Sequence, residues 1–353
     1  MALVFTVVTG IAGGALATVL QAPIPWLLGS LLCTAALTSA GVHLKRLPGT
    51  LEKWMRVLVG VALGPSVANS LGNVGSSTLM AVLASLLSVV LLAAIGYGFF
   101  QRALGMSRGE AYLSALPGGL SFMMALADEL HVADKSSRPR IALVHTVRVV
   151  SLVLFVSLIA MLLGTDLQKG SFWEWFAIAI SLEWQWLVLL VVIVLSMWLA
   201  ETLSIAGGHV TIPLVISTVF YASGLITAPM PPLVITTAML VFGCILGCEL
   251  GSGPRSEYPK LAGGSLILTS IAFVFGALLA LGLGEVSGYG FLVLFLALAP
   301  GGIAEVALIA LALGLDVGII AMVHLCRFLF IMIIGPIGLR RIDRHRSASD
   351  KRT

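Results

Sequence analysis

The chain has 353 residues, of which 59% are hydrophobic and only 10% are charged, and its formal net charge is +4. This composition excludes a soluble globular domain, because soluble domains carry far more charge and less apolar sequence. Several apolar runs reach the roughly 20 residues that an α-helix needs to cross the bilayer core. We therefore expect an all-α polytopic membrane protein, with the lipid bilayer as its first partner.

In chain order, the first span is expected within residues 1–20, which lack the basic segment that begins a signal peptide. Further apolar runs follow at 78–100, 141–164, 187–200 with its flanks, 261–283 and 317–338. Between the two middle runs, residues 166–183 carry Trp173 and Trp175, which are typical of a segment in the membrane interface.

The chain contains an internal repeat. A shift of 183 positions places Pro117-Gly118-Gly119 on Pro300-Gly301-Gly302, and Gly60 and Gly64 on Gly243 and Gly247. With a four-residue gap, His145 and Arg148 match His324 and Arg327, and with small gaps IPWLLGSLL near the start matches IPLVISTVF at 212–220. Landmarks in the same order indicate a duplication. The predicted organisation is a first repeat at 1–165, an interfacial linker at 166–183, a second repeat at 184–339 and a basic cytoplasmic tail at 340–353.

The basic residues decide how the PGG segments are expected to lie. If each segment crossed the membrane, Arg138 and Arg140 would face the side opposite the basic tail, against the positive-inside tendency. If each segment instead enters and returns, each half has about five transmembrane helices and both termini are cytoplasmic. An odd number of spans inverts the second repeat relative to the first. We therefore expect two inverted repeats, each with a PGG re-entrant hairpin or broken helix; a kinked packing helix is the alternative.

The PGG segments also suggest a binding site. Proline ends a helix, glycine permits a tight turn, and backbone amides freed in the membrane must be buried in protein or face a wet cavity. The helices that resume afterwards would point their partly positive N-termini inward, which favours an anion. The residues expected at this centre are the hairpin breaks Pro117 and Pro300 and the substrate-binding glycines Gly118, Gly119, Gly301 and Gly302.

Two arginines lie inside apolar runs. Arg148 and Arg327 are on the order of 10–15 Å from the nearest span end, where an isolated arginine is costly and needs a partner or a wet cavity. His145 and His324 share a helix face with them. In one interpretation, the arginines bind an anionic substrate, the histidines are polar neighbours and Glu305 carries a coupling proton. In the other, the arginines brace the hairpins and Glu305 is a buried counter-charge, with Arg327 as its obvious partner.

The duplicated IPWLLG, PGG and H-x-x-R pattern resembles the AbrB family of bacterial integral membrane proteins over essentially the whole chain. The resemblance implies two AbrB duplication domains in the bacterial cytoplasmic membrane. It does not extend to the small soluble DNA-binding regulator of similar name. Members are often labelled as ammonia monooxygenases or as regulators of aidB expression, and the family supplies no catalytic residues. Phe122 stands where the second repeat has Glu305, so the two repeats are not equivalent in function.

From these patterns we expect a secondary transporter of a small, anionic metabolite, coupled to a proton or a sodium ion. The alternative is a membrane-bound regulator of gene expression that acts indirectly, because only the short basic tail is soluble. Neither enzymatic activity, a cofactor, a metal site nor direct nucleic-acid binding is expected, since the six histidines are scattered and form no ligand cluster for copper or iron. The identity of the solute and a homo-oligomeric state are left open.

Overall fold

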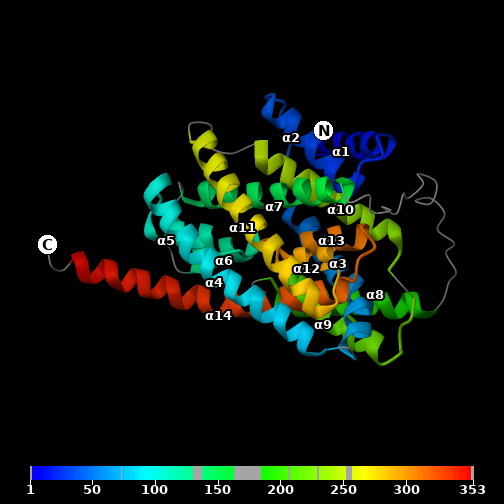
Figure 1. Cartoon of the computed structure of the whole chain (residues 1–353). Coiled ribbons are helices and arrows are strands. Elements are labelled where there is room, and N and C mark those ends of the chain that lie inside the picture. Colours follow the sequence, from blue (N-terminus) through cyan, green and yellow to red (C-terminus); the bar gives the residue numbers. More distant parts are fainter. Residues whose placement is uncertain are drawn as a thin grey trace. The chain divides into compact units, whose positions relative to one another are not determined.

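The computed structural model describes residues 2–72, 74–129, 137–162, 184–205, 207–228, 230–251 and 257–350. These residues form helices joined by turns and short connections, without a strand among them (Figure 1). Seven of the described helices are long and apolar enough to cross a membrane. The chain is an all-α polytopic membrane protein, as its composition predicted. The predicted linker at 166–183 lies outside the described residues.

The two halves contain matching sets of helices. The first set is α1 (Ala2–Val19), α2 (Pro25–Ser39), α3 (Gly49–Leu71), α4 (Ser76–Leu104), α5 (Arg108–Ala115), α6 (Leu120–Glu129) and α7 (Ser137–Leu162). The second set is α8 (Trp184–Leu203), α9 (Gly208–Ala222), α10 (Pro232–Gly251), α11 (Tyr258–Ser287), α12 (Phe291–Leu298), α13 (Ile303–Ala312) and α14 (Val317–Asp350). The bounds of α9, α12 and α13 are those of α2, α5 and α6 shifted by 183 residues.

Unusual backbone conformations repeat with the same spacing. Positive φ angles occur at Gln21, Ile24, Gly41 and Gly105, and again at Ser204, Gly207, Gly224 and Gly288, each 183 residues later. A positive φ is uncommon outside glycine, so this recurrence shows that the two halves follow the same local path. The gapped match of IPWLLGSLL to IPLVISTVF is therefore wrong, because α2 and α9 correspond without a gap.

The described helices belong to two compact units, and each unit takes segments from both halves. Unit 1 comprises Met1–Val74, Leu152–Ser252 and Ala304–Ala321. Unit 2 comprises Gly75–Ser151, Gly253–Ile303 and Met322–Thr353. The predicted boundary between repeats thus does not coincide with the division into compact units, because helices of the two halves interleave.

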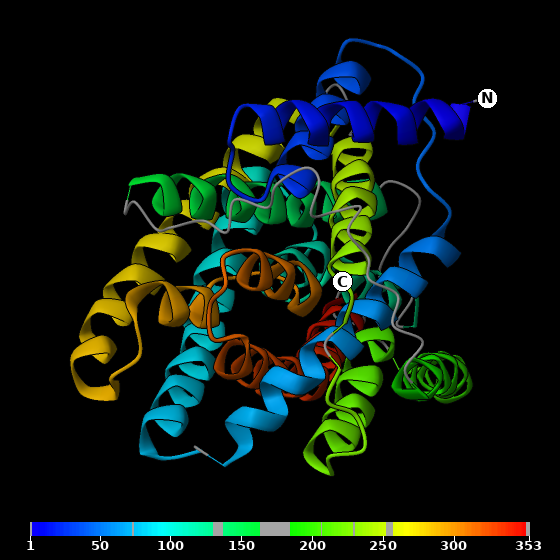
Figure 2. The same ribbon diagram turned by 90° about the vertical axis from the view of Figure 1, so that its right-hand side faces the viewer.

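Unit 1 is built on close helix contacts that occur twice. Glycines of α3 lie against α9, and glycines of α10 lie against α2, while α1 packs on both α2 and α10 (Figure 2). The contact pairs are Gly60 with Pro213, Gly64 with Ser217, Gly243 with Ser30 and Gly247 with Thr34. A methyl group at any of these glycines would collide with the facing helix, which explains the GxxxG spacing. Because the pairs are related by 183 residues, each half supplies the partner of the other.

The outer faces of several long helices are apolar. On α4, α8 and α11 the exposed large side chains recur every three or four residues, as on one face of a helix. They include Leu79, Leu83 and Leu87 on α4, Leu187, Val191 and Val194 on α8, and Ile267, Ile271 and Val274 on α11. Such faces fit contact with lipid tails. In contrast, 72% of the apolar window of α7, which carries His145 and Arg148, is buried.

In each half a PGG segment interrupts the helical path. Helix α5 ends before Pro117 and α12 ends before Pro300. The preceding residues Leu116 and Ala299 are extended, with ψ angles of 127° and 139°, because the proline ring excludes a helical conformation from the residue before it. None of the four PGG glycines has a positive φ, so proline causes the break and glycine is not required for a left-handed turn. Re-entry into the bilayer stays a prediction.

Candidate functional site

The first arginine clamp, as we call His145 and Arg148 with the carbonyl groups they hold, joins α7 to the end of α5. Arg148 Nη1 donates to the carbonyl oxygen of Leu116 at 2.9 Å, and its Nη2 donates to that of Ser114 at 2.6 Å. His145 Nε2 lies 3.1 Å from the carbonyl oxygen of Leu113. The last carbonyls of a helix have no partner within the helix, so at Leu113 and Ser114 the clamp binds acceptors that the end of α5 leaves open. The carbonyl oxygen of Leu116 also accepts from the backbone N–H of Gly118 at 2.9 Å.

The second arginine clamp repeats this arrangement with His324 and Arg327 of α14. Arg327 Nη1 donates to the carbonyl oxygen of Ala299 at 2.6 Å, and Nη2 donates to that of Gly301 at 2.7 Å. His324 Nε2 lies 2.9 Å from the carbonyl oxygen of Leu296. Both histidine bonds and one arginine bond thus fall on matching positions of the two halves. In each half an arginine thus joins its helix to the backbone at the break, and both the bracing and the anion-binding interpretation stay predictions.

Each clamp holds both ring nitrogens of its histidine. The guanidinium of Arg148 lies 3.3 Å from His145 Nδ1, and that of Arg327 lies 2.7 Å from His324 Nδ1. Arginine has donors only, so Nδ1 accepts and carries no hydrogen. Nε2 therefore carries the hydrogen and donates to the leucine carbonyl.

The two arginines are buried without a counter-ion in the described part of the chain. Arg148 is 5% exposed and Arg327 is 3% exposed, and neither takes part in an ion pair among the described residues. Both belong to unit 2, where their guanidinium charges repel each other. The carbonyl oxygens complement the guanidinium N–H groups, but they carry only partial charges. Unit 2 therefore holds two buried positive charges that the described side chains do not neutralise.

Helix α14 contacts both breaks within unit 2. Beside Arg327, the ring of Phe328 packs edge-to-face on Phe122 of α6, with ring centroids 5.4 Å apart. The hydroxyl group of Tyr112 on α5 donates to the carbonyl oxygen of Ile334 at 2.8 Å. The helix that clamps the second break thus also packs on the helices on either side of the first break.

The PGG glycines differ between the two breaks. Gly118 and Gly119 are half-buried, whereas Gly301 and Gly302 are buried. A methyl group at Gly119 would meet no heavy atom of the described residues within 4 Å, while one at Gly118 would meet the end of the Met123 side chain. The space beside Gly119 adjoins the start of α6, where the first backbone N–H groups have no partner within the helix. The first break therefore offers both room and hydrogen-bond donors.

Glu305 lies in unit 1, where its ion pair is with Arg56 of α3. The distance from Glu305 Oε1 to Arg56 Nη2 is 3.8 Å, and Glu305 Oε2 has no hydrogen-bond partner among the described residues. The sequence did not single out Arg56. A signal was present, since Glu52 and Arg56 are spaced as a helical ion pair at the start of an apolar run. The suggested pairing of Glu305 with Arg327 stays a prediction, because these residues belong to different units.

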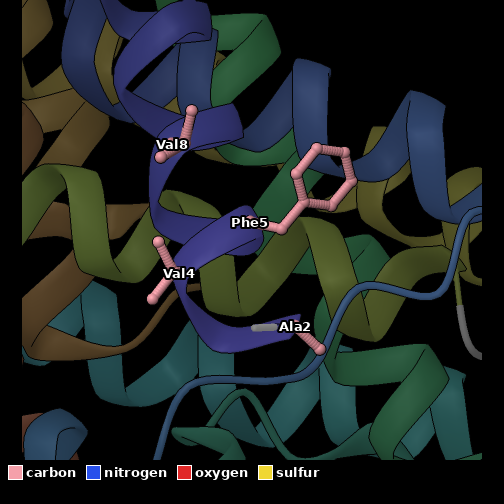
Figure 3. Close-up of a pocket in the computed structure, with 4 residues that line it drawn as sticks. All are labelled: Ala2, Val4, Phe5 and Val8. Atoms are coloured by element: carbon pink, nitrogen blue, oxygen red, sulfur yellow. The ribbon is translucent and has the colours of Figure 1, made fainter.

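A hollow on α1 and clusters of metal-binding side chains are the other places to look for a ligand. A shallow hollow on the outer face of α1 is lined by Ala2, Val4, Phe5 and Val8 (Figure 3). All four side chains are apolar, so the hollow fits a lipid-facing surface and not the recognition of a charged solute. Within the described ranges, no three His, Cys, Asp or Glu side chains come together as metal ligands.

The chain matches one known family. A family model described as "Transition state regulatory protein AbrB" covers residues 43–343, which is most of the chain. The search of curated proteins found no match to the chain. The match includes both PGG segments and both arginine clamps.

Proposed function

The chain belongs to the membrane-type AbrB family, and from this premise we propose that it is a secondary transporter of a small anionic solute. The observation that carries the proposal is the pair of arginine clamps. Arg148 and Arg327 are buried in one unit and have no carboxylate partner among the described residues. A buried charge without a partner is costly, so two such charges in one unit favour an anion as the missing partner.

The hydrogen bonds of the clamps support the same solute class. Arginine has five N–H donors, and each clamp arginine uses three of them for the carbonyl and histidine contacts. The remaining donors suit a carboxylate or phosphate oxygen, which guanidinium groups bind well. Beside the first break, the open space at Gly119 gives such a group room.

The duplicated broken helices support transport over other membrane roles. Many secondary transporters consist of two related repeats whose interrupted helices meet at the solute site. This chain has two matching sets of helices with a break at the same place in each. The proposal includes inverted orientation of the repeats, a bacterial cytoplasmic membrane and cytoplasmic termini, because the basic residues then lie on one side.

A second candidate is indirect regulation of gene expression from the membrane. It is supported by the description of the family model, which names a regulatory protein. Transport and regulation differ in the components that each activity requires. A transporter must move a solute in a purified system, whereas a regulator needs a cellular partner.

The decisive experiment reconstitutes the full chain into lipid vesicles and screens small carboxylates and phosphates for uptake or exchange. The expected result is uptake of at least one compound that an imposed ion gradient increases. The same anion should raise the unfolding temperature of the protein in detergent, because a ligand stabilises the state that binds it. Absence of uptake and stabilisation across the panel, with folded protein, would overturn the proposal and favour regulation.

A matched pair of variants separates anion binding from bracing. Arg148→Gln removes the charge but keeps an amide that can donate to a carbonyl oxygen, whereas His145→Gln disturbs the same clamp and keeps the charge. If Arg148 binds the anion, only Arg148→Gln should abolish uptake and anion-dependent stabilisation. Equal losses in both variants would show that the clamp is purely structural.

A further inference from the structure

Five charged side chains form a connected network in unit 1. Arg46 Nη2 lies 2.8 Å from Glu249 Oε1 and 3.0 Å from Glu52 Oε2. Arg56 Nη2 lies 2.7 Å from Glu52 Oε1 and 3.8 Å from Glu305 Oε1. The order along the network is therefore Glu249, Arg46, Glu52, Arg56 and Glu305, and the sign of the charge alternates at every step.

The network leads from an exposed group to a buried one. The side chain of Arg46, between α2 and α3, is 52% exposed, whereas that of Glu305 on α13 is 9% exposed. Glu52 and Arg56 belong to α3, and Glu249 belongs to α10. Lys53, also on α3, pairs with Glu201 of α8 and is not part of the network. Three helices and a connecting segment thus contribute to one charge system.

The three carboxylates of the network differ in how well they are paired, and Glu305 has the longest contact, at 3.8 Å from Arg56. A poorly paired charge in a buried environment is unfavourable, and proteins usually relieve it by pairing or by a change of protonation.

The hydrogen bonds indicate which carboxylate of the network is best placed to take a proton. Glu52 accepts from Arg56 Nε, Arg56 Nη2 and Arg46 Nη2, and Glu249 lies 2.8 Å from Arg46. Glu305 Oε1 is beyond hydrogen-bond distance of Arg56, and Oε2 has no partner among the described residues. A proton on Glu305 Oε2 therefore breaks no hydrogen bond. Arg56 would stay bonded to Glu52 and over the ring of Phe242, so it would not be left without a partner.

We propose that Glu305 binds the coupling proton of this protein and that its charge controls the link between α13 and α3. The inference rests on the proposed function only in linking the bound proton to transport; proton binding by Glu305 is argued from the contacts alone. The proton comes from water, forms an O–H bond on Oε2 and returns to water. Ionised Glu305 attracts Arg56 and ties α13 to α3, whereas the protonated form loosens that tie. Arg56 would repel a sodium ion at this position, so a proton is the favoured ion.

The test measures proton binding without any solute. Infrared difference spectra of the full-length protein between acidic and neutral pH should show the C=O band of a protonated carboxyl group. Glu305→Gln should remove this band, and Glu305→Asp should keep it at a shifted frequency. Glu201→Gln is the matched control, because it removes a glutamate of the same unit outside the network, and it should leave the band unchanged.

The outcomes separate this inference from transport itself. A band that persists in Glu305→Gln would overturn the proton site, even if uptake is observed. If an anion is transported, Glu305→Gln should keep anion exchange but lose accumulation driven by a pH gradient. Loss of the band in Glu305→Gln would support the proton site even if no compound in the panel were transported.

Discussion

The first and second PGG breaks are held by the same kind of clamp but are followed by different residues. After the first break, Phe122 packs on Phe328 of α14. After the second, Glu305 joins the charge network through Arg56. The two halves thus share their bracing and differ in their chemistry. The difference separates the H-x-x-R clamps, which both breaks have, from Glu305, which only the second break has; in our proposals the clamp arginines serve the anion and Glu305 serves the proton.

The two breaks also differ in how deeply their glycines are buried. The glycines of the first break are half-buried, with open space at Gly119, whereas those of the second break are buried. In our proposal the first break provides room for the solute and the second precedes the proton-binding residue. The comparison is open to three mutational tests.

The largest effect is expected when a clamp arginine is replaced by methionine. Arg148→Met or Arg327→Met removes three hydrogen bonds of a charged donor, which should cost on the order of 3 kcal/mol or more of unfolding free energy. The losses should be similar at the two positions because each arginine makes two bonds to carbonyl oxygens and one to its histidine. Unfolding of the purified variants in detergent measures this. A full loss at one position and none at the other would contradict a shared bracing role.

An intermediate loss of stability is expected when Phe122, which follows the first break, is replaced by the glutamate that stands at the matching position after the second break. Phe122→Glu would bury a carboxylate against Phe328, so we expect a loss of about 2–3 kcal/mol from the unpaired polar group and the missing ring contact. Glu305→Gln should change the unfolding free energy by less than about 1 kcal/mol, because Arg56 retains Glu52. Unfolding by denaturant in mild detergent checks both values, with Phe122→Leu as a control for lost ring packing. Equal stability of Phe122→Glu and Phe122→Leu would mean that the first break also accommodates a charge.

The smallest effect on stability is expected at the glycines of the first break. Gly119→Ala adds a methyl group where, in the part of the chain that the structure describes, no heavy atom lies within 4 Å, so its unfolding free energy should change by at most about 0.5 kcal/mol. Uptake should nevertheless fall if the solute occupies that space. Gly118→Ala is the matched control, because it displaces only the flexible end of Met123. Normal uptake by Gly119→Ala would place the solute elsewhere.

The fold class and the positions of the breaks could be predicted from the sequence, because apolar length and proline act locally. The repeat could also be predicted. Its alignment near Pro25 and Pro213 was predicted with gaps, and the structure shows that α2 and α9 correspond without a gap. The clamp targets could not be predicted, because they are backbone carbonyl oxygens, which leave no trace in the pattern of side chains. The partner of Glu305 was missed because Arg56 lies far away in the sequence and next to a nearer partner, Glu52.

The doubled glycine contacts of unit 1 have a consequence for biosynthesis. Helix α3 packs its glycines on α9, and α2 receives those of α10, so neither half can bury these surfaces by itself. When the first half leaves the ribosome, its small-residue faces stay exposed to lipid until the second half has been synthesised. The newly inserted first half is therefore a substrate for membrane quality control for as long as the second half is missing. Two separately expressed halves should protect each other from degradation.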